Sequence, residues 1–271
     1  MSTEFPPETA EGWSVLHELY EIDWQSIKRG DAGKLRAEVQ EVSEWLAGRE
    51  TLSDDGQSAA FSMLGHKGQF MLLHFAPSFD LCGELEKQFL RTDFARHFRL
   101  SNSYVSIVEL GMYTVSKKAV ESLTAKGLEP HSAEWRAEFD AMISPHRANL
   151  SERCFTEIPE KKYFCFYPMS KRRGEVNNWY KEKIDRRADL MMEHGITGRR
   201  YADRVSQIIS GSIGFDDWEW GVDLFSDEPL AFKQLVYEMR FDEATSLYGE
   251  FGPFYFGMRL PASKWSDFFV S

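Results

Sequence analysis

The order of strand-like and helix-like segments along this chain occurs twice. Apolar residues that alternate or recur at helical spacing predict strand, helix, two strands, helix and strand in each half. In the first half these segments lie at 13–22, 33–46, 59–65, 69–75, 81–90 with 93–97, and 103–112. In the second half they lie at 162–167, 181–194, 205–210, 218–225, 229–239 and 252–259. This order is that of a ferredoxin-like unit. Its repetition predicts two such units in one chain.

A few identities support the repeat. At a constant offset of 149 residues, Arg91 aligns with Arg240 and Asp93 with Asp242, so the same Arg-x-Asp pattern follows the second helical segment of each half. We therefore predict an α+β chain with two ferredoxin-like modules. Their antiparallel sheets are expected to pack side by side, with the helices outside.

Module boundaries follow from the same patterns. Residues 13–112 form the predicted N-terminal module and residues 161–271 the predicted C-terminal module, which carries the candidate site. Residues 1–12 are expected to be a flexible N-terminus. Residues 113–160 form a polar connection with one helical candidate at 133–142. A connection of this length is typical of a functional segment or a lid.

Composition excludes several classes of protein. A net charge of -11 over 271 residues argues against a nucleic-acid surface, which needs clustered cations. Three cysteines without C-x-x-C spacing predict reduced core residues, with neither a disulfide framework nor a zinc site. No apolar run is long enough to span a membrane, and the first twelve residues lack the apolar stretch of a signal peptide. We expect a soluble, cytoplasmic protein.

One short region concentrates side chains capable of chemistry. Residues 167–173 read Tyr-Pro-Met-Ser-Lys-Arg-Arg, and His194 ends the next predicted helix, followed by Gly195. A phenol, a thioether, three cations and an imidazole in one supersecondary unit favour a site for an anionic, metal-containing ligand. By spacing alone, a structural histidine at a helix C-terminus with a glycine cap is the commoner interpretation.

The neighbouring residues allow similar alternatives. Strand alternation places Tyr163, Cys165 and Tyr167 on one face, and Pro168 is expected to end the strand so that Met169 begins a loop. Tyr167 is therefore either a redox-active phenol or a half-buried strand tyrosine with a satisfied hydroxyl.

Charged and polar residues nearby offer further candidates. Lys171 and Arg153 could pair with carboxylates, whereas Arg172 and Arg173 are better explained as a solvated charge run. Gln207 is a polar group on an apolar strand and needs a partner, either a ligand or the backbone. The acidic residues between 216 and 223 lack the spacing of a cation-binding loop, so we expect no second metal site.

Several longer motifs resemble a known family. Residues 167–173, 207–225, 237–243 and 248–257, together with His194-Gly195, closely resemble the coproheme decarboxylases of the chlorite-dismutase-like superfamily. The match is dense over residues 150–260, and the N-terminal half matches by element order. The resemblance implies two ferredoxin-like modules per subunit, a homopentamer, and a ligand held in the C-terminal module.

The resemblance also implies a reaction. In that family, hydrogen peroxide oxidises iron coproporphyrin III (coproheme), and two propionates become vinyl groups with loss of carbon dioxide through a tyrosyl radical, giving haem b. The iron porphyrin is thus both substrate and redox centre. His194 matches the proximal iron ligand of the family, Tyr167 the radical-forming tyrosine, and Lys171 the lysine that positions or deprotonates a reacting propionate.

Four further positions match the family's pocket. Met169 matches a pocket residue near the reacting propionate, and Arg153 matches a propionate-binding arginine. Gln207 stands where chlorite dismutases carry a distal arginine, which favours decarboxylation over chlorite chemistry. Thr245 stands where many relatives have a propionate-contacting serine, and it keeps the hydroxyl.

Two other functions fit the same fold. One is a chlorite dismutase or nonspecific haem peroxidase, which Arg at position 207 or Phe at position 167 would have favoured. The other is a haem sensor or carrier without turnover, which would need His194 but has no use for Tyr167 together with Lys171. We also expect a transient contact with the ferrochelatase that inserts the iron.

Overall fold

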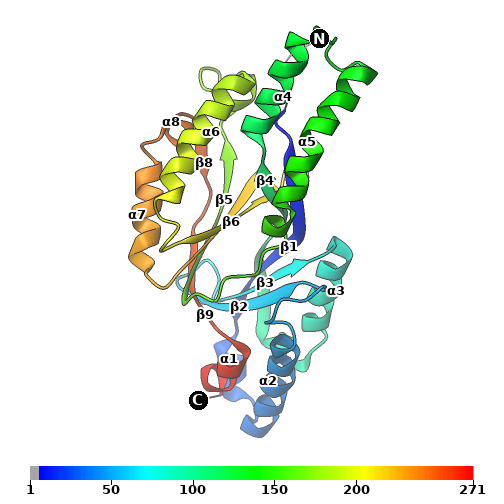
Figure 1. The fold of residues 1–271 in the computed structure, drawn as a ribbon. Coiled ribbons are helices and arrows are strands. Elements are labelled where there is room, and N and C mark those ends of the chain that lie inside the picture. Colours follow the sequence, from blue (N-terminus) through cyan, green and yellow to red (C-terminus); the bar gives the residue numbers. More distant parts are fainter. Residues whose placement is uncertain (1–5, 271) are drawn as a thin grey trace.

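The N-terminal module has the predicted order of elements (Figure 1). The computed structural model describes residues 6–270. The elements are β1 (Thr9–Ile22), α1 (Trp24–Arg29), α2 (Ala32–Ala47), β2 (Gln57–Met63), β3 (Phe70–Ala76), α3 (Phe79–Leu90), η1 (Asp93–His97) and β4 (Phe98–Gly111). β1 begins before the predicted start at Trp13, because Thr9 to Glu11 already pair with β4. Residues 1–5, part of the predicted flexible N-terminus, lie outside the described residues.

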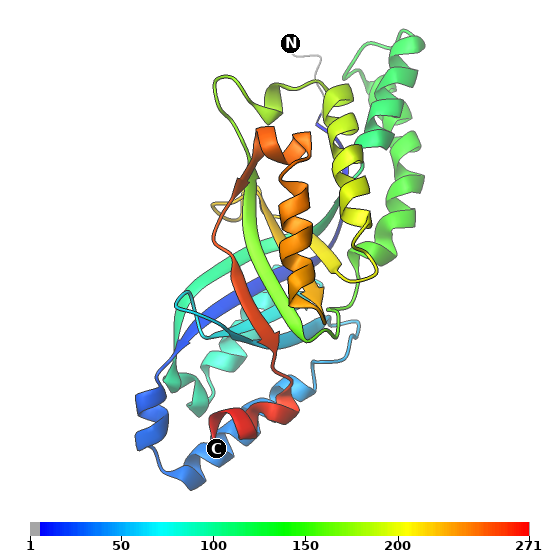
Figure 2. The same ribbon diagram turned by 90° about the vertical axis from the view of Figure 1, so that its left-hand side faces the viewer.

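Two long helices connect the modules, where we predicted a polar segment with one short helix. They are α4 (Tyr113–Ala125) and α5 (Ala133–Cys154), which lie side by side in Figures 1 and 2. The Ser132 hydroxyl starts α5 by accepting a hydrogen bond from the Trp135 amide at 3.1 Å. The second half of α5 was not predicted because Pro145 and polar residues dominate its sequence.

The C-terminal module repeats the order with additions near its end. Its elements are β5 (Tyr163–Lys171), η2 (Trp179–Lys181), α6 (Ile184–Arg199), β6 (Ser206–Gly211), β7 (Trp220–Ser226), α7 (Pro229–Met239), α8 (Glu243–Tyr248), β8 (Gly249–Phe251), β9 (Tyr255–Arg259), η3 (Ala262–Lys264) and α9 (Trp265–Phe269). The final helix, α9, packs against α2 of the N-terminal module through Trp265 and Phe269. The two modules therefore share an apolar cluster.

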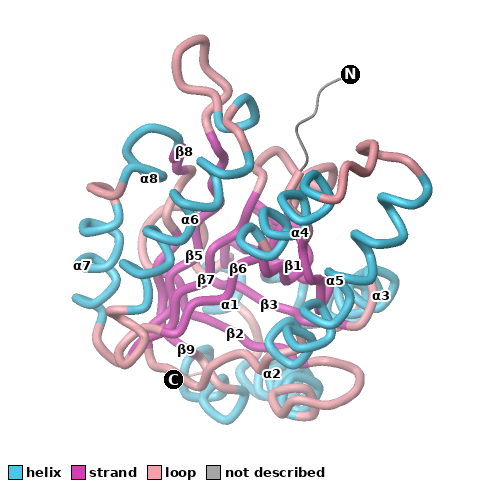
Figure 3. The backbone as a smooth tube through the Cα atoms, turned by 45° about the horizontal axis from the view of Figure 1, so that its top comes forward, coloured by secondary structure: helices cyan, strands magenta, loops and turns pink. Residues whose placement is uncertain are grey.

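The strands of both modules form one antiparallel sheet in the order β7-β6-β4-β1-β3-β2-β9-β5-β8. The modules join where β4 pairs with β6 and where β2 pairs with β9. Because β5 also pairs with β7, the sheet closes on itself, and Figure 3 shows the strands at the centre with helices around them. The predicted α+β class, with two ferredoxin-like sheets side by side and helices outside, is confirmed.

Alternation along the strands separates two apolar layers. Side chains such as Phe61, Phe164 and Phe225 fill the interior enclosed by the sheet, whereas Cys165, Tyr167 and other outward-facing residues pack against the helices of the C-terminal module. The predicted shared face of Tyr163, Cys165 and Tyr167 is confirmed.

The predicted end of β5 at Pro168 is wrong. β5 continues to Lys171, and Pro168 lies opposite Gly221 of β7. The Pro168 carbonyl accepts a hydrogen bond from the Gly252 amide at 2.9 Å. A Cβ at position 252 would lie only 2.8 Å from Pro168 Cγ, so glycine there lets the backbone at residue 252 pass close to the proline ring.

The predicted end of the helix at His194 is also wrong. α6 continues through Gly195 and Gly198 to Arg199, so His194 lies within the helix. Each interior glycine costs a helix about 1 kcal/mol relative to alanine, which is why the pattern predicted an end. Close packing accounts for one of them, because a Cβ at Gly198 would lie 3.1 Å from Met239 Cε of α7.

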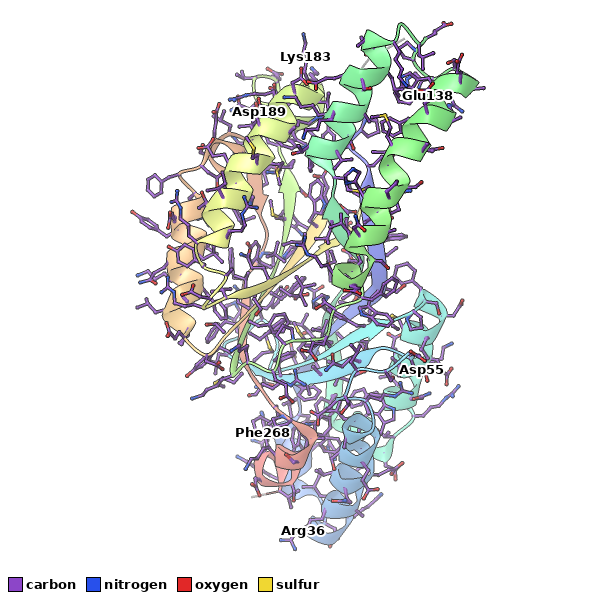
Figure 4. The ribbon with its side chains drawn as sticks, in the orientation of Figure 1. Arg36, Asp55, Glu138, Lys183, Asp189 and Phe268 are labelled. Atoms are coloured by element: carbon purple, nitrogen blue, oxygen red, sulfur yellow. The ribbon has the colours of Figure 1, made fainter. Side chains whose placement is uncertain are left out.

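Figure 4 shows Lys183, the N-cap of α6, toward one end of the molecule and Arg36 of α2 at the other. Among residues 6–270, none of the helices combines the length and the apolar character needed to cross a bilayer.

Candidate functional site

One large cavity opens between α6 and the outer face of the sheet. Its volume is about 870 Å³, and its walls come from β4, β5, β6, β7, the C-terminal end of α5, α6 and α8. All seven residues that the sequence singled out line it: Arg153, Tyr167, Met169, Lys171, His194, Gln207 and Thr245. The structure therefore brings together side chains that lie up to 92 positions apart in the sequence.

The imidazole of His194 is held by a carboxylate. Its Nδ1 lies 2.9 Å from Asp242 Oδ2 and 3.3 Å from the Thr245 hydroxyl. Among the described residues, Nε2 has no hydrogen-bond partner, and about a quarter of the side chain is exposed. A histidine whose Nδ1–H is bonded to a carboxylate has its other nitrogen available to bind a metal.

Asp242 was missed by the sequence analysis. It is the N-cap of α8, and its Oδ1 accepts a hydrogen bond from the Thr245 amide at 2.8 Å. Burial raises its pKa, but the hydrogen bonds from His194 and Thr245 outweigh burial and hold the pKa below its ordinary value. The aspartate therefore stays anionic beside the imidazole. An Asp three residues before Thr245 is an N-cap signal that could have drawn attention to it.

Tyr167 lies on β5 with only 5% of its surface exposed. Its ring stacks on Phe254 at 4.4 Å and lies 5.7 Å from Phe251. Burial raises the pKa of the phenol far above its usual value, so the phenol is protonated at neutral pH. No hydrogen-bond partner for its hydroxyl exists among the described residues, which leaves the hydroxyl available to a ligand.

Lys171, at the end of β5, is an almost fully buried cation. Its Nζ lies 3.3 Å from the Ala244 carbonyl and 4.7 Å from the ring centre of Trp179. Burial lowers its pKa to about 8, although the charges of Asp242 and Glu219 act in the opposite direction. A lysine with this pKa can hold or release a proton near neutral pH.

The remaining predicted residues line the cavity and differ in exposure. Met169 is half-buried on β5, and Gln207 is half-buried on β6 near Gly198. Arg153 is exposed in the last turn of α5. The Thr245 hydroxyl is 3.3 Å from Asp242 Oδ2, so it belongs to the group that holds His194.

Arg172 and Arg173 do not line the cavity. Arg172 is half-buried and lies 3.5 Å from Glu250, and Arg173 is exposed and lies 3.8 Å from Glu219. Their interpretation as a solvated charge run stays a prediction.

One known protein family matches most of this chain. The sequence model described as chlorite dismutase matches residues 35–260, which is most of the chain. The chain belongs to the chlorite dismutase family. The family resemblance read from the motifs is therefore confirmed.

Several family relatives carry functional names. A coproheme decarboxylase of Staphylococcus saprophyticus is 38% identical over 97% of this chain and 98% of its own length. Putative heme-binding proteins of Haloquadratum walsbyi and Natronomonas pharaonis are 42% and 41% identical over 96% and 98% of this chain. The chain spans only 46% and 42% of the lengths of these two proteins, so it corresponds to part of each.

Solved structures of the family share the fold. A heme-binding protein from Thermus thermophilus superposes with a TM-score of 0.83 at 36% identity, covering 100% of both chains. Chlorite dismutase from Candidatus Nitrospira defluvii superposes with a TM-score of 0.70 at 16% identity, covering 96% of both chains. The second comparison shows the fold alone.

Two more charged residues of this family member lie near the site and were not predicted. The Arg240 guanidinium lies 4.6 Å from the ring centre of Phe251, and its charge acts against the burial that raises the pKa of Tyr167. The Arg-x-Asp pattern at 240–242 was noticed only as evidence of a repeat.

Glu109 of β4 lines the cavity and accepts a hydrogen bond from Trp220 Nε1 at 3.1 Å. Apart from its place on an apolar strand, no sequence pattern singles it out.

Proposed function

We propose that this chain catalyses the hydrogen-peroxide-dependent oxidative decarboxylation of two propionates of iron coproporphyrin III, giving haem b. The observation that carries this proposal is the convergence of Tyr167, Lys171 and His194 on one cavity. A haem carrier needs only the histidine, whereas a radical decarboxylation also needs an oxidisable group and a cation beside the propionate. The staphylococcal relative is named a coproheme decarboxylase, which supports the same activity.

The residues present fit an iron porphyrin. The cavity volume lies within the range of roughly 300–1,000 Å³ typical of small-molecule sites. Val222, Ile209 and Phe251 give it apolar walls for a flat macrocycle. Four propionates bring about four negative charges near neutral pH, so a protein of net charge -11 needs local cations to hold them. Lys171 and Arg153 supply two of these cations.

Each side chain then has a separate role. Bound iron porphyrin supplies the redox chemistry, drawing oxidising equivalents from hydrogen peroxide. His194 binds the iron through Nε2 while Asp242 holds Nδ1. Tyr167 gives up one electron and one proton and, as a radical, takes a hydrogen atom from the propionate. Its stacking on Phe254 keeps the phenol away from bulk water.

The overall reaction balances without another cofactor. For each propionic acid group, conversion to a vinyl group releases one carbon dioxide, two electrons and two protons, and one hydrogen peroxide is reduced to two waters. Lys171 orients the reacting carboxylate by charge and can exchange a proton with it, because its pKa is about 8. Gln207 offers a neutral amide in the cavity, where an arginine would favour chlorite chemistry.

A titration of the protein loaded with iron coproporphyrin III tests the proposal. Hydrogen peroxide is added stepwise and the porphyrin mass is followed. We expect two successive losses of a carboxyl group, through an intermediate with one vinyl group, with haem b as the final product. Bleaching of the porphyrin without decarboxylation, or turnover of chlorite in place of decarboxylation, would contradict the proposal.

A further inference from the structure

A carboxyl group lies inside a cavity that we expect to receive an anion. Glu109 of β4 lines the cavity, and its Oε1 accepts a hydrogen bond from Trp220 Nε1 at 3.1 Å. Its other oxygen occupies the space beside Gly211, where a Cβ would lie only 2.1 Å from Glu109 Oε2. The Glu109 carboxyl thus has a defined position. The indole of Trp220 holds one oxygen, and the absence of a side chain at Gly211 leaves room for the other.

Strand register places Glu109 across the cavity from Tyr167. Tyr167 of β5 pairs with Val222 of β7, and Val222 pairs with Ile209 of β6. Val108 of β4 pairs with Ser210 of β6, so Glu109 lies beside Ile209 in the same row. Neighbouring strands are about 4.8 Å apart, so three strand spacings, roughly 14 Å measured along the curved sheet, lie between Tyr167 and Glu109. A porphyrin with its propionates has a comparable width.

The surroundings of Glu109 favour its protonated form. Burial raises the pKa of its carboxyl and Glu11 of β1 raises it further, although the hydrogen bond from Trp220 acts in the opposite direction. Tyr113 of α4 is another titratable group nearby. Burial raises the pKa of its phenol, and the charge of Glu109 raises it further. A charged carboxylate in this position would repel propionates. A neutral carboxyl group can donate a hydrogen bond to one.

We propose that Glu109 and Trp220 form a second carboxylate-binding site, which holds a propionate at the edge of the porphyrin opposite Tyr167. The inference rests on the proposed substrate. Glu109 donates a hydrogen bond to the propionate through Oε2, while Trp220 fixes Oε1. The site orients the substrate by holding a propionate on the side that is not reacting.

Binding of two zinc porphyrins tests this site without any redox step. Zinc coproporphyrin III has four propionates and its tetramethyl ester has no free carboxylate, and both are fluorescent. We expect Glu109→Ala to weaken binding of zinc coproporphyrin III about tenfold, the usual effect of losing one hydrogen bond to a charged group. Binding of the tetramethyl ester should stay unchanged.

Two further variants serve as controls. Glu109→Gln keeps both a donor and an acceptor, so it should bind zinc coproporphyrin III like the wild type and would also reveal a folding defect specific to Ala. Glu157→Ala removes an exposed carboxylate that also lines the cavity, and it should not weaken binding. Unchanged or tighter binding of zinc coproporphyrin III by Glu109→Ala, or equal weakening of both porphyrins, would overturn the proposal. Failure of the wild type to bind zinc coproporphyrin III would overturn the proposed function as well.

Discussion

Asp242 connects His194 to the start of helix α8. One carboxylate oxygen lies 2.9 Å from His194 Nδ1, and the other accepts the Thr245 amide at 2.8 Å. The imidazole is therefore fixed in orientation by a residue that is itself fixed by a helix cap. This relationship leaves Nε2 as the nitrogen available to a metal.

Replacing Asp242 with Asn tests that relationship. Asparagine is also a good N-cap, so α8 should persist, but the negative charge that holds the imidazole is lost. We expect the affinity for ferric coproporphyrin III to fall about tenfold, as is typical when the hydrogen-bond partner of a metal-binding histidine is changed. Absorbance titration measures the affinity. Asp203→Asn, at an exposed position, is the matched control, and equal affinities of the two variants would argue against the role of Asp242.

Lys171→Met should make the ligand-free protein more stable. The pKa of Lys171 is about 8 in the folded protein and about 10.4 in an unfolded chain, so folding disfavours its charged form. We expect the free energy of unfolding at pH 7 to rise by about 1–3 kcal/mol. The gain should shrink as the pH rises from about 8 to 10.4. Over this range Lys171 is already neutral in the folded wild type, and the unfolded chain progressively loses the same proton.

Denaturant unfolding at several pH values measures this effect. Lys233→Met, which removes an exposed lysine of α7, should change stability by less than about 0.5 kcal/mol. A Lys171→Met protein that is less stable than the wild type at every pH would show that the contacts of Lys171 with Ala244 and Trp179 outweigh its burial.

A buried histidine–carboxylate pair lies in the interior enclosed by the sheet. His17 Nε2 and Asp223 Oδ1 are 2.8 Å apart, and both side chains are fully buried. Removing one member of such a pair leaves the other without its partner, so Asp223→Ala should lower the free energy of unfolding by about 3–5 kcal/mol. Chemical denaturation measures the loss, with the exposed Asp203→Ala as the control. A loss below about 1 kcal/mol would mean that His17 finds another partner.

Much of the fold could be predicted because strand alternation and helical spacing are local properties. They placed Tyr163, Cys165 and Tyr167 on one face, which the structure confirms. The pairing of β4 with β6 and of β2 with β9 was not predicted, since it depends on which sheet edges meet in space. Pro168 and Gly195 were interpreted as ends of elements because their local preferences oppose strand and helix, and tertiary packing overrides those preferences.

The candidate site was predicted in part for a similar reason. Tyr167, Lys171, His194 and Gln207 were candidates from their residue types and positions, and the family resemblance added Thr245. Asp242 and Glu109 were missed because their contacts join residues 48 and 111 positions apart. No local pattern reports such contacts. A polar residue on a strand is informative only when its neighbours in space are known.

The oxidation of Tyr167 is the central claim about mechanism. Tyr167→Phe removes the hydroxyl and keeps the ring that stacks on Phe254. Porphyrin binding should therefore persist while decarboxylation is lost. Tyr163→Phe is the matched control, because Tyr163 lies on the same face of β5 but does not line the cavity.

The most direct measurement is the mass of the porphyrin after stoichiometric hydrogen peroxide is added to each protein loaded with iron coproporphyrin III. We predict that the wild type and Tyr163→Phe yield haem b, and that Tyr167→Phe retains an iron porphyrin with all four carboxyl groups. Decarboxylation by Tyr167→Phe at the wild-type rate would contradict the radical role of Tyr167.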